Sequence, residues 1–204
     1  MRQRRYLPVL LVATIALVGA GGFRVKLDDL WRDPTPGARE FEKLLVIAIT
    51  EDRDVRRNFE NRFVSHLRGL EIEGVTSRSM APDLTRIEDE DDIVERIRAD
   101  GIDGAISVRA VSLGKNDPSY AEWVAAWRAA NEQPGDLREL IDDSLPVAET
   151  GAKLYGIEIA LWETGGWRRI WAGRSTGYKP KQLRKGAGDF VQYVMHVLKS
   201  ENLL

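Results

Sequence analysis

The residues best suited to chemistry lie where an apolar strand runs into a charged helix, in the stretch LLVIAITEDRDVRRNFENRF (44–63). In many α/β proteins such a junction holds a phosphate on the free N–H groups of the helix. A phosphate cradle needs glycine, and the turn TEDRDVRR has none. Its acidic residues would repel an anion, and Arg56 and Arg57 already lie inside the expected helix, where a solvated position is favoured. The junction is therefore predicted to be a packing unit.

Other catalytic and metal-binding patterns are weak or missing from the sequence. It contains no cysteine, no G-x-S-x-G and no H-E-x-x-H. His66 and His196 lie on expected helices beside apolar neighbours, where a structural role is expected. The acidic run 88–92 lacks the alternating spacing and the glycine of a calcium loop, so a charged helix N-terminus explains it better. We predict no catalytic residue, no metal and no cofactor, although 32 acidic residues leave open a carboxylate pair for glycan hydrolysis.

Residues 1–20 have the layout of a bacterial export signal. Arginines at positions 2, 4 and 5 precede an apolar run from Leu7 to Val18, and Ala20 stands at the −1 position before Gly21. The run is shorter than the roughly 20 residues that span a bilayer, which favours a cleaved signal over an uncleaved membrane anchor. Ala20 also occupies the place of a lipid-bearing cysteine, so no acyl anchor is expected. We predict a periplasmic protein, or one anchored in the inner membrane and facing the periplasm, with the N-terminal segment as the membrane contact.

The charge balance argues against nucleic acid as a partner. The chain has a formal net charge of −2, and removing the three leader arginines makes the remainder more acidic. Binding a polyanion requires clustered Lys and Arg that displace counterions. Residues 21–40 carry Gly, Pro and mixed charge without a sustained apolar period, so they are predicted to be a linker, and residues 41–204 are predicted to form the folded domain.

Within that domain, the apolar patterning predicts an α/β fold, a single domain with a mixed β-sheet of about five strands and helices packed on it. The expected order is β-α-β-α-β-insertion-β-β-α. The first helix is expected to be capped by Thr50 or Asp52 and to bury Phe59 and Phe63, and the last helix to begin near Ala187. The expected strands are 43–49, 71–79, 101–114, 152–163 and 167–178, with the last two forming a hairpin.

The insertion, residues 115–151, is the least predictable part. A capping box from Ser119 to Glu122 predicts a helix that places Tyr120, Trp123 and Trp127 on one face. These three side chains either pack the helix onto the sheet or form a surface that binds a partner or a glycan, because Trp and Tyr are frequent interface anchors.

Several short motifs together resemble a family of small bacterial cell-envelope proteins of unknown function, often lipoproteins. The motifs are an Arg-Arg-x-Phe-Glu helix, a Gly-Val-x-x-x-Ser strand, a Gly-x-Asp-Gly turn into a strand, and a late hairpin with a Trp on its second strand. The matching positions are Arg56, Arg57, Phe59, Glu60, Gly74, Val75, Ser79, Gly101, Asp103, Gly104 and Trp171. At lower resolution the arrangement is similar to TolB N-terminal, CsgG-type and LpoB-type domains.

The resemblance implies a non-enzymatic domain that binds other envelope components. We therefore expect an exported, envelope-associated accessory protein whose partner is another envelope protein. The alternative is an exported hydrolase that acts on glycan or peptidoglycan through carboxylates. The sequence identifies neither the partner nor the oligomeric state.

Overall fold

Ten helices and strands make up the part of the chain that the computed structural model describes, residues 25–34, 40–50, 52–80, 90–112, 155–166 and 168–204. The strands are β1 (Asp29–Arg32), β2 (Lys43–Ile49), β3 (Glu73–Thr76), β4 (Gly104–Ser112), β5 (Tyr155–Glu163) and β6 (Arg168–Tyr178). The helices are α1 (Arg53–Arg68), α2 (Ser77–Met80), α3 (Glu90–Ala99) and α6 (Pro180–Ser200).

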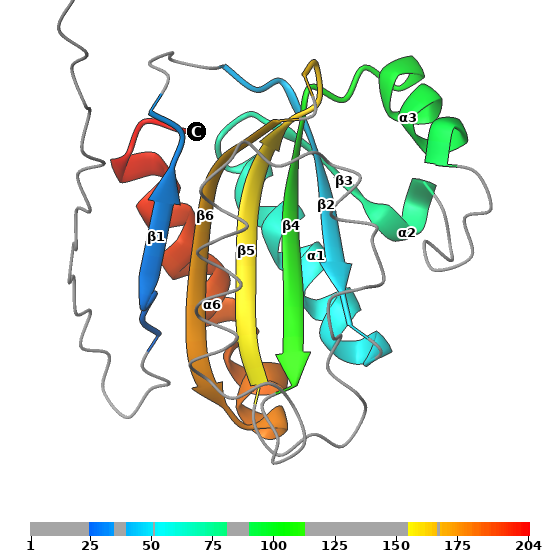
Figure 1. The fold of residues 1–204 in the computed structure, drawn as a ribbon. Helices are drawn as coiled ribbons and strands as arrows, with labels where there is room; N and C mark the ends of the chain where they lie inside the picture. Colours follow the sequence, from blue (N-terminus) through cyan, green and yellow to red (C-terminus); the bar gives the residue numbers. More distant parts are fainter. Residues whose placement is uncertain (1–24, 35–39, 51, 81–89, 113–154, 167) are drawn as a thin grey trace, which may run out of the picture.

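The strands form one mixed sheet in the order β1-β6-β5-β4-β2-β3, which confirms the predicted α/β fold (Figure 1). β2 pairs in parallel with β3 and β4, and every other neighbouring pair is antiparallel. The helix α1 connects β2 to the parallel strand β3, as the apolar run followed by an amphipathic helix predicts. The predicted hairpin forms from β5 and β6 around the turn at Thr164, Gly165 and Gly166.

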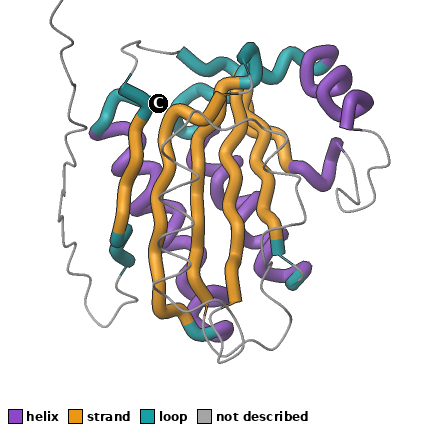
Figure 2. Tube along the Cα trace, in the orientation of Figure 1, coloured by secondary structure: helices purple, strands orange, loops and turns teal. Residues whose placement is uncertain are grey.

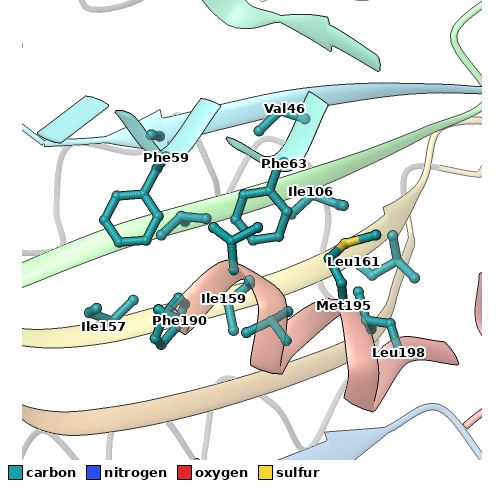
Figure 3. Packing of buried hydrophobic residues seen from close by; sticks show 14 of the residues in the cluster. Val46, Phe59, Phe63, Ile106, Ile157, Ile159, Leu161, Phe190, Met195 and Leu198 are labelled. Atoms are coloured by element: carbon teal, nitrogen blue, oxygen red, sulfur yellow. The ribbon is translucent and has the colours of Figure 1, made fainter. Parts of the chain in front are cut away.

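The helices α1 and α6 lie on the same face of the sheet (Figures 1 and 2). Their apolar stripes and the facing strand residues form the larger of two hydrophobic clusters. Phe59 and Phe63 of α1 are buried in it, as predicted, together with Phe190 of α6 (Figure 3). The rings of Phe59 and Phe190 meet edge to face, with centroids 5.7 Å apart. The two helices are therefore held to each other as well as to the sheet.

A smaller cluster lies on the opposite face. Met80 of α2 and Ile97 of α3 pack there with strand residues that alternate with those of the first cluster, among them Leu45, Ala105 and Trp162. Because successive strand residues point to opposite faces, the near-continuous apolar run of β2 serves both clusters. The sheet is thus buried on two sides along this strand.

The structure corrects the expected start of the folded domain. Residues 29–32 lie in the region predicted to be a linker, yet they form β1, which pairs antiparallel with β6 at the edge of the sheet. Leu27 is also buried in the first cluster, and Val25 packs against it. A strand of four residues, flanked by charges, is too short for an alternating pattern to show in the sequence.

Two further boundaries differ from the prediction. The strand predicted over 71–79 ends at Thr76, and the residues that follow it form the short helix α2. The last helix begins at Pro180 rather than near Ala187, because proline suits the first helical position after the cap, Lys179. Gly186 and Gly188 lie in the first half of this helix, and because glycine disfavours a helix, the sequence pattern predicted a later start. One of them, Gly188, lies where an added Cβ would come within 2.6 Å of Arg62 Nη1, so α1 approaches α6 closely there.

Replacing Gly104 by alanine is expected to destabilise the domain, because the start of β4 has no room for a Cβ. An added Cβ would lie 2.4 Å from Cε1 of Phe41 and 2.6 Å from Cδ2 of Leu44, both in the core. Overpacking of this kind costs about 1–3 kcal/mol. Urea denaturation should show the loss as a lower midpoint at an unchanged slope.

The control for Gly104→Ala is Gly165→Ala in the β5–β6 turn, where an added Cβ would meet nothing within 4 Å. That variant should leave the midpoint nearly unchanged. A second variant, Gly104→Ala combined with Phe41→Leu, should recover part of the loss because it removes ring atoms from the crowded position. Equal midpoints for the two glycine variants would contradict the packing argument.

Candidate functional site

The partner-binding residues predicted from the insertion, Tyr120, Trp123 and Trp127, lie outside the described residues, and their role stays a prediction. Most of the motif residues lie in the described part of the chain. They belong chiefly to a buried carboxylate cluster beside α1 and to a turn that clamps β2.

The buried carboxylate of Glu60 is the centre of the first cluster. Its Oε1 accepts a hydrogen bond of 2.6 Å from the Ser77 hydroxyl and one of 3.4 Å from the main-chain N–H of Ala48. The guanidinium Nε of Arg56 lies 3.3 Å from the same oxygen, and Nε of Arg78 lies 2.8 Å from Oε2. Glu60 is wholly buried, and these donors surround both of its oxygens.

This cluster joins two motifs that are far apart in the sequence. Arg56 and Glu60 come from the Arg-Arg-x-Phe-Glu helix, whereas Ser77 and Arg78 occupy two of the unspecified positions of Gly-Val-x-x-x-Ser, directly after β3 ends. Arg56 also donates to Ser77 across 3.1 Å, which closes the network. The cluster therefore ties α1 to the residues that follow β3.

The chemistry of this cluster is that of a structural clamp. A general acid or base needs a carboxylate that reaches a substrate, and a nucleophile needs an open lone pair. Both oxygens of Glu60 are used inside the protein, and two guanidiniums neutralise the charge. Of the other residues of the helical motif, Phe59 is buried in the core, whereas Arg57 is exposed.

At the strand–helix junction that first suggested a phosphate site, the side chain of Asp52 caps the N-terminus of α1. Oδ1 of Asp52, the N-cap of α1, accepts hydrogen bonds from the N–H groups of Asp54 and Val55, at 3.1 and 3.2 Å. The donors that would hold an anion at a helix N-terminus are thus already used. The predicted cap is confirmed.

The Gly-x-Asp-Gly motif forms a second clamp. Asp103 accepts hydrogen bonds from the main-chain N–H groups of Glu42 and Lys43, at 2.7 and 3.2 Å. Gly101 adopts a φ of +67°, in the left-handed region that glycine tolerates best. Thr164 closes the turn by donating from its hydroxyl to the carbonyl of Ile102 across 2.7 Å. The motif therefore aligns β2 with β4.

The second face of the sheet carries a stack that the sequence did not reveal. The guanidinium carbon of Arg169 lies 5.5 Å from the ring centre of Trp31 and 5.3 Å from that of Trp162. The indole of Trp162 donates to the Ser107 hydroxyl across 2.9 Å, which fixes its orientation. Trp162 and Arg169 are buried, whereas Trp31 is half-buried on the edge strand. A cation between two aromatic rings is attracted to both of them.

A row of charges crosses the same face next to this stack. Register places Arg109, Glu158, Arg174 and Asp29 side by side on four neighbouring strands, with alternating sign. Arg174 forms an ion pair with Asp29, and its side chain is only 1% exposed. Opposite charges directly across strands stabilise a sheet. The row also ties β1 to the centre of the sheet.

In the described part of the chain, no three His, Cys, Asp or Glu side chains meet in a way that could hold a metal ion. His66 and His196 are exposed on α1 and α6. None of the described helices combines the length and the apolar character needed to cross a membrane.

Comparison with known proteins shows a partial likeness to solved structures. No family model and no curated protein matches the chain. Two structures of the PelC dodecamer from Paraburkholderia phytofirmans, one of a point variant, have 13% identity and TM-scores of 0.42 and 0.41. They match 81% of this chain and 94% and 93% of PelC. Lipoprotein GNA1162 from Neisseria meningitidis has 9% identity and a TM-score of 0.39, over 78% of this chain and 96% of that one.

Sequence reasoning missed Trp31 and its neighbours for a definite reason. Trp31 lies in a segment predicted to be a linker, and its contacts come from residues more than 100 positions away. The one available signal was a Trp between charged residues in DLWRD, and such a residue in a linker would be exposed at a cost. The Glu60 cluster was missed because its two halves meet only after α1 has packed.

Proposed function

We propose that this protein is an exported accessory protein of the bacterial envelope that binds another envelope protein and catalyses no reaction. Export is supported by the leader-like residues 1–20. A non-catalytic role is supported by the motif carboxylates of Glu60 and Asp103, which accept hydrogen bonds inside the fold. One observation carries the proposal. The edge strand β1 presents a half-exposed tryptophan, Trp31, on a rigid support formed by Arg169.

The edge position matters because β1 is paired on one side only within the described sheet. An edge strand offers main-chain N–H and C=O groups to an added strand, and alternate side chains supply specificity. Trp and Arg dominate the centres of protein interfaces, since they bury large areas and lose little freedom when already held in place. Trp31 therefore combines an edge strand with a preorganised anchor.

Crosslinking from position 31 tests the proposal. A photo-crosslinking amino acid in place of Trp31, in the full chain expressed in its native cells, should give one discrete adduct with an envelope protein. The same amino acid in place of Glu95, an exposed residue of α3, should give none. With the partner purified, Trp31→Ala should weaken binding by roughly 30-fold, as for an interface hot spot, and Trp31→Phe by less.

The hydrolase alternative predicts a different outcome. Turnover of cell-wall glycan by the purified chain, together with no adduct from position 31, would overturn the proposed function. Loss of binding in Trp31→Ala must come with an unchanged denaturation midpoint, because the stack also stabilises the sheet edge. Trp162→Phe serves as the matched control, since it alters the buried side of the same stack and leaves Trp31 in place.

A further inference from the structure

The charge of this protein is unevenly distributed between its layers. The helices α1 and α6 carry nine basic and three acidic residues, whereas the whole chain has a net charge of −2. The two helices thus have a net charge of +6, which leaves −8 for the remainder. One of their three acids, Glu60, is buried in its clamp and does not reach the surface.

The exposed surface of this helical layer carries many more basic than acidic side chains among those the structure describes. Among the described side chains of α1, α6 and the cap of α6, none of the exposed ones is apolar, and only Asp54 and Asp189 are acidic. The exposed basic side chains are Arg53, Arg57, Arg62, Arg68, Lys179, Lys181, Lys185 and Lys199. They extend from the first residue of α1 to its last, and from the cap of α6 to its last turn.

The start of the described chain packs beneath the same helical layer. Leu27 is buried in the cluster beneath α1 and α6, and Val25 packs against it. The carbonyl of Lys26 accepts a hydrogen bond from the Ser175 hydroxyl, close to the end of β6 and the start of α6. Val25 and Leu27, at the start of the described chain, therefore pack on the side of the sheet that carries the basic layer.

We infer that the outer surface of α1 and α6 adsorbs to anionic phospholipid headgroups. Each basic side chain near a negatively charged bilayer adds attraction, and a broad layer of two neighbouring helices can place many of them at the membrane plane. A protein partner fits less well, because a stable protein interface has an apolar core, whereas the exposed side chains that the structure describes in this layer are all polar or charged. The adsorption leaves the opposite face of the sheet, which carries Trp31, turned away from the bilayer.

Vesicle flotation of the full chain tests this inference. The protein should bind vesicles containing phosphatidylglycerol more strongly than vesicles of phosphatidylcholine alone, and the difference should disappear near 0.5 M salt, where screening shortens the Debye length to about 4 Å. Lys181→Glu combined with Lys185→Glu should lower binding to the anionic vesicles by roughly 30-fold or more. Binding to phosphatidylcholine should not change, since it reports only on the apolar leader.

The matched control is Arg96→Glu combined with Arg98→Glu, two exposed basic residues on α3, outside the helical layer. It changes the net charge of the protein by the same amount and should retain most of the anionic binding. Equal losses in the two double variants would overturn the inference, because net charge alone would then explain them. Preference for an acidic polysaccharide over anionic vesicles at equal charge concentration would overturn it too.

This inference rests on the proposed envelope location but not on the β1 surface. Trp31→Ala should leave vesicle binding unchanged, and the α6 double variant should retain the crosslink from position 31. If only the crosslink fails, the partner-binding function is wrong and the membrane surface stands. If only the preference for anionic vesicles fails, the membrane surface is wrong and the partner-binding function stands.

Discussion

Replacing Glu60 by alanine is expected to lower the free energy of unfolding by about 3 kcal/mol. The substitution removes a wholly buried carboxylate and leaves Ser77 and the Ala48 N–H without their acceptor. Breaking a buried ion pair from one side costs about 3–5 kcal/mol. The lower end applies here, because the side chains of Arg56 and Arg78 are 15% and 31% exposed and can regain water. Urea denaturation followed by circular dichroism measures the loss.

Two variants separate charge from shape in this cluster. Glu60→Gln keeps the size of the side chain but replaces one acceptor oxygen with a donor that faces a guanidinium, so its cost should approach that of alanine. Glu73→Ala is the surface control, because Glu73 pairs with Lys43 while its own side chain is 64% exposed. Exposed pairs of that kind contribute about 0–1 kcal/mol. A Glu60 variant as stable as the Glu73 variant would refute the clamp.

The clamp illustrates what local sequence patterns can and cannot predict. The bounds of β2, the cap at Asp52, the burial of Phe59 and Phe63 and the β5–β6 hairpin all follow from periodicity, capping chemistry and turn residues within short windows. Glu60 shares a helix with Phe63, yet nothing in its own window indicates that its carboxylate is buried. That depends on Ser77 and Arg78, which arrive from the end of β3.

The same reasoning explains the error at β1. Its four residues join the sheet because β6 offers an open edge and because Arg174 and Arg169 hold Asp29 and Trp31. Each of these contacts spans most of the chain in sequence. The local composition of residues 21–40 predicts a linker, and only the pairing with β6 makes residues 29–32 a strand. The surface that carries the proposed function therefore depends on contacts that no local sequence pattern shows.

Replacing Phe190 by alanine is expected to cost about 3–5 kcal/mol, the largest loss from a single apolar side chain that we predict. Phe190 is completely buried and touches two aromatic rings edge to face, Phe59 at 5.7 Å and Tyr178 at 6.2 Å between centroids. It thus joins α6 to both α1 and the end of β6. The measurement is the denaturation midpoint, with Phe190→Leu as the milder variant that fills most of the cavity.

A double-mutant cycle with Phe59→Leu distinguishes the aromatic contact from simple loss of volume. Edge-to-face pairs contribute about 0.5–1.5 kcal/mol beyond the area they bury, so Phe59→Leu and Phe190→Leu together should cost less than their separate losses combined. Additive losses would mean that α1 and α6 are held to the sheet independently. Coupling would mean that the contact between the two rings stabilises the packing of α1 against α6 beyond the area it buries.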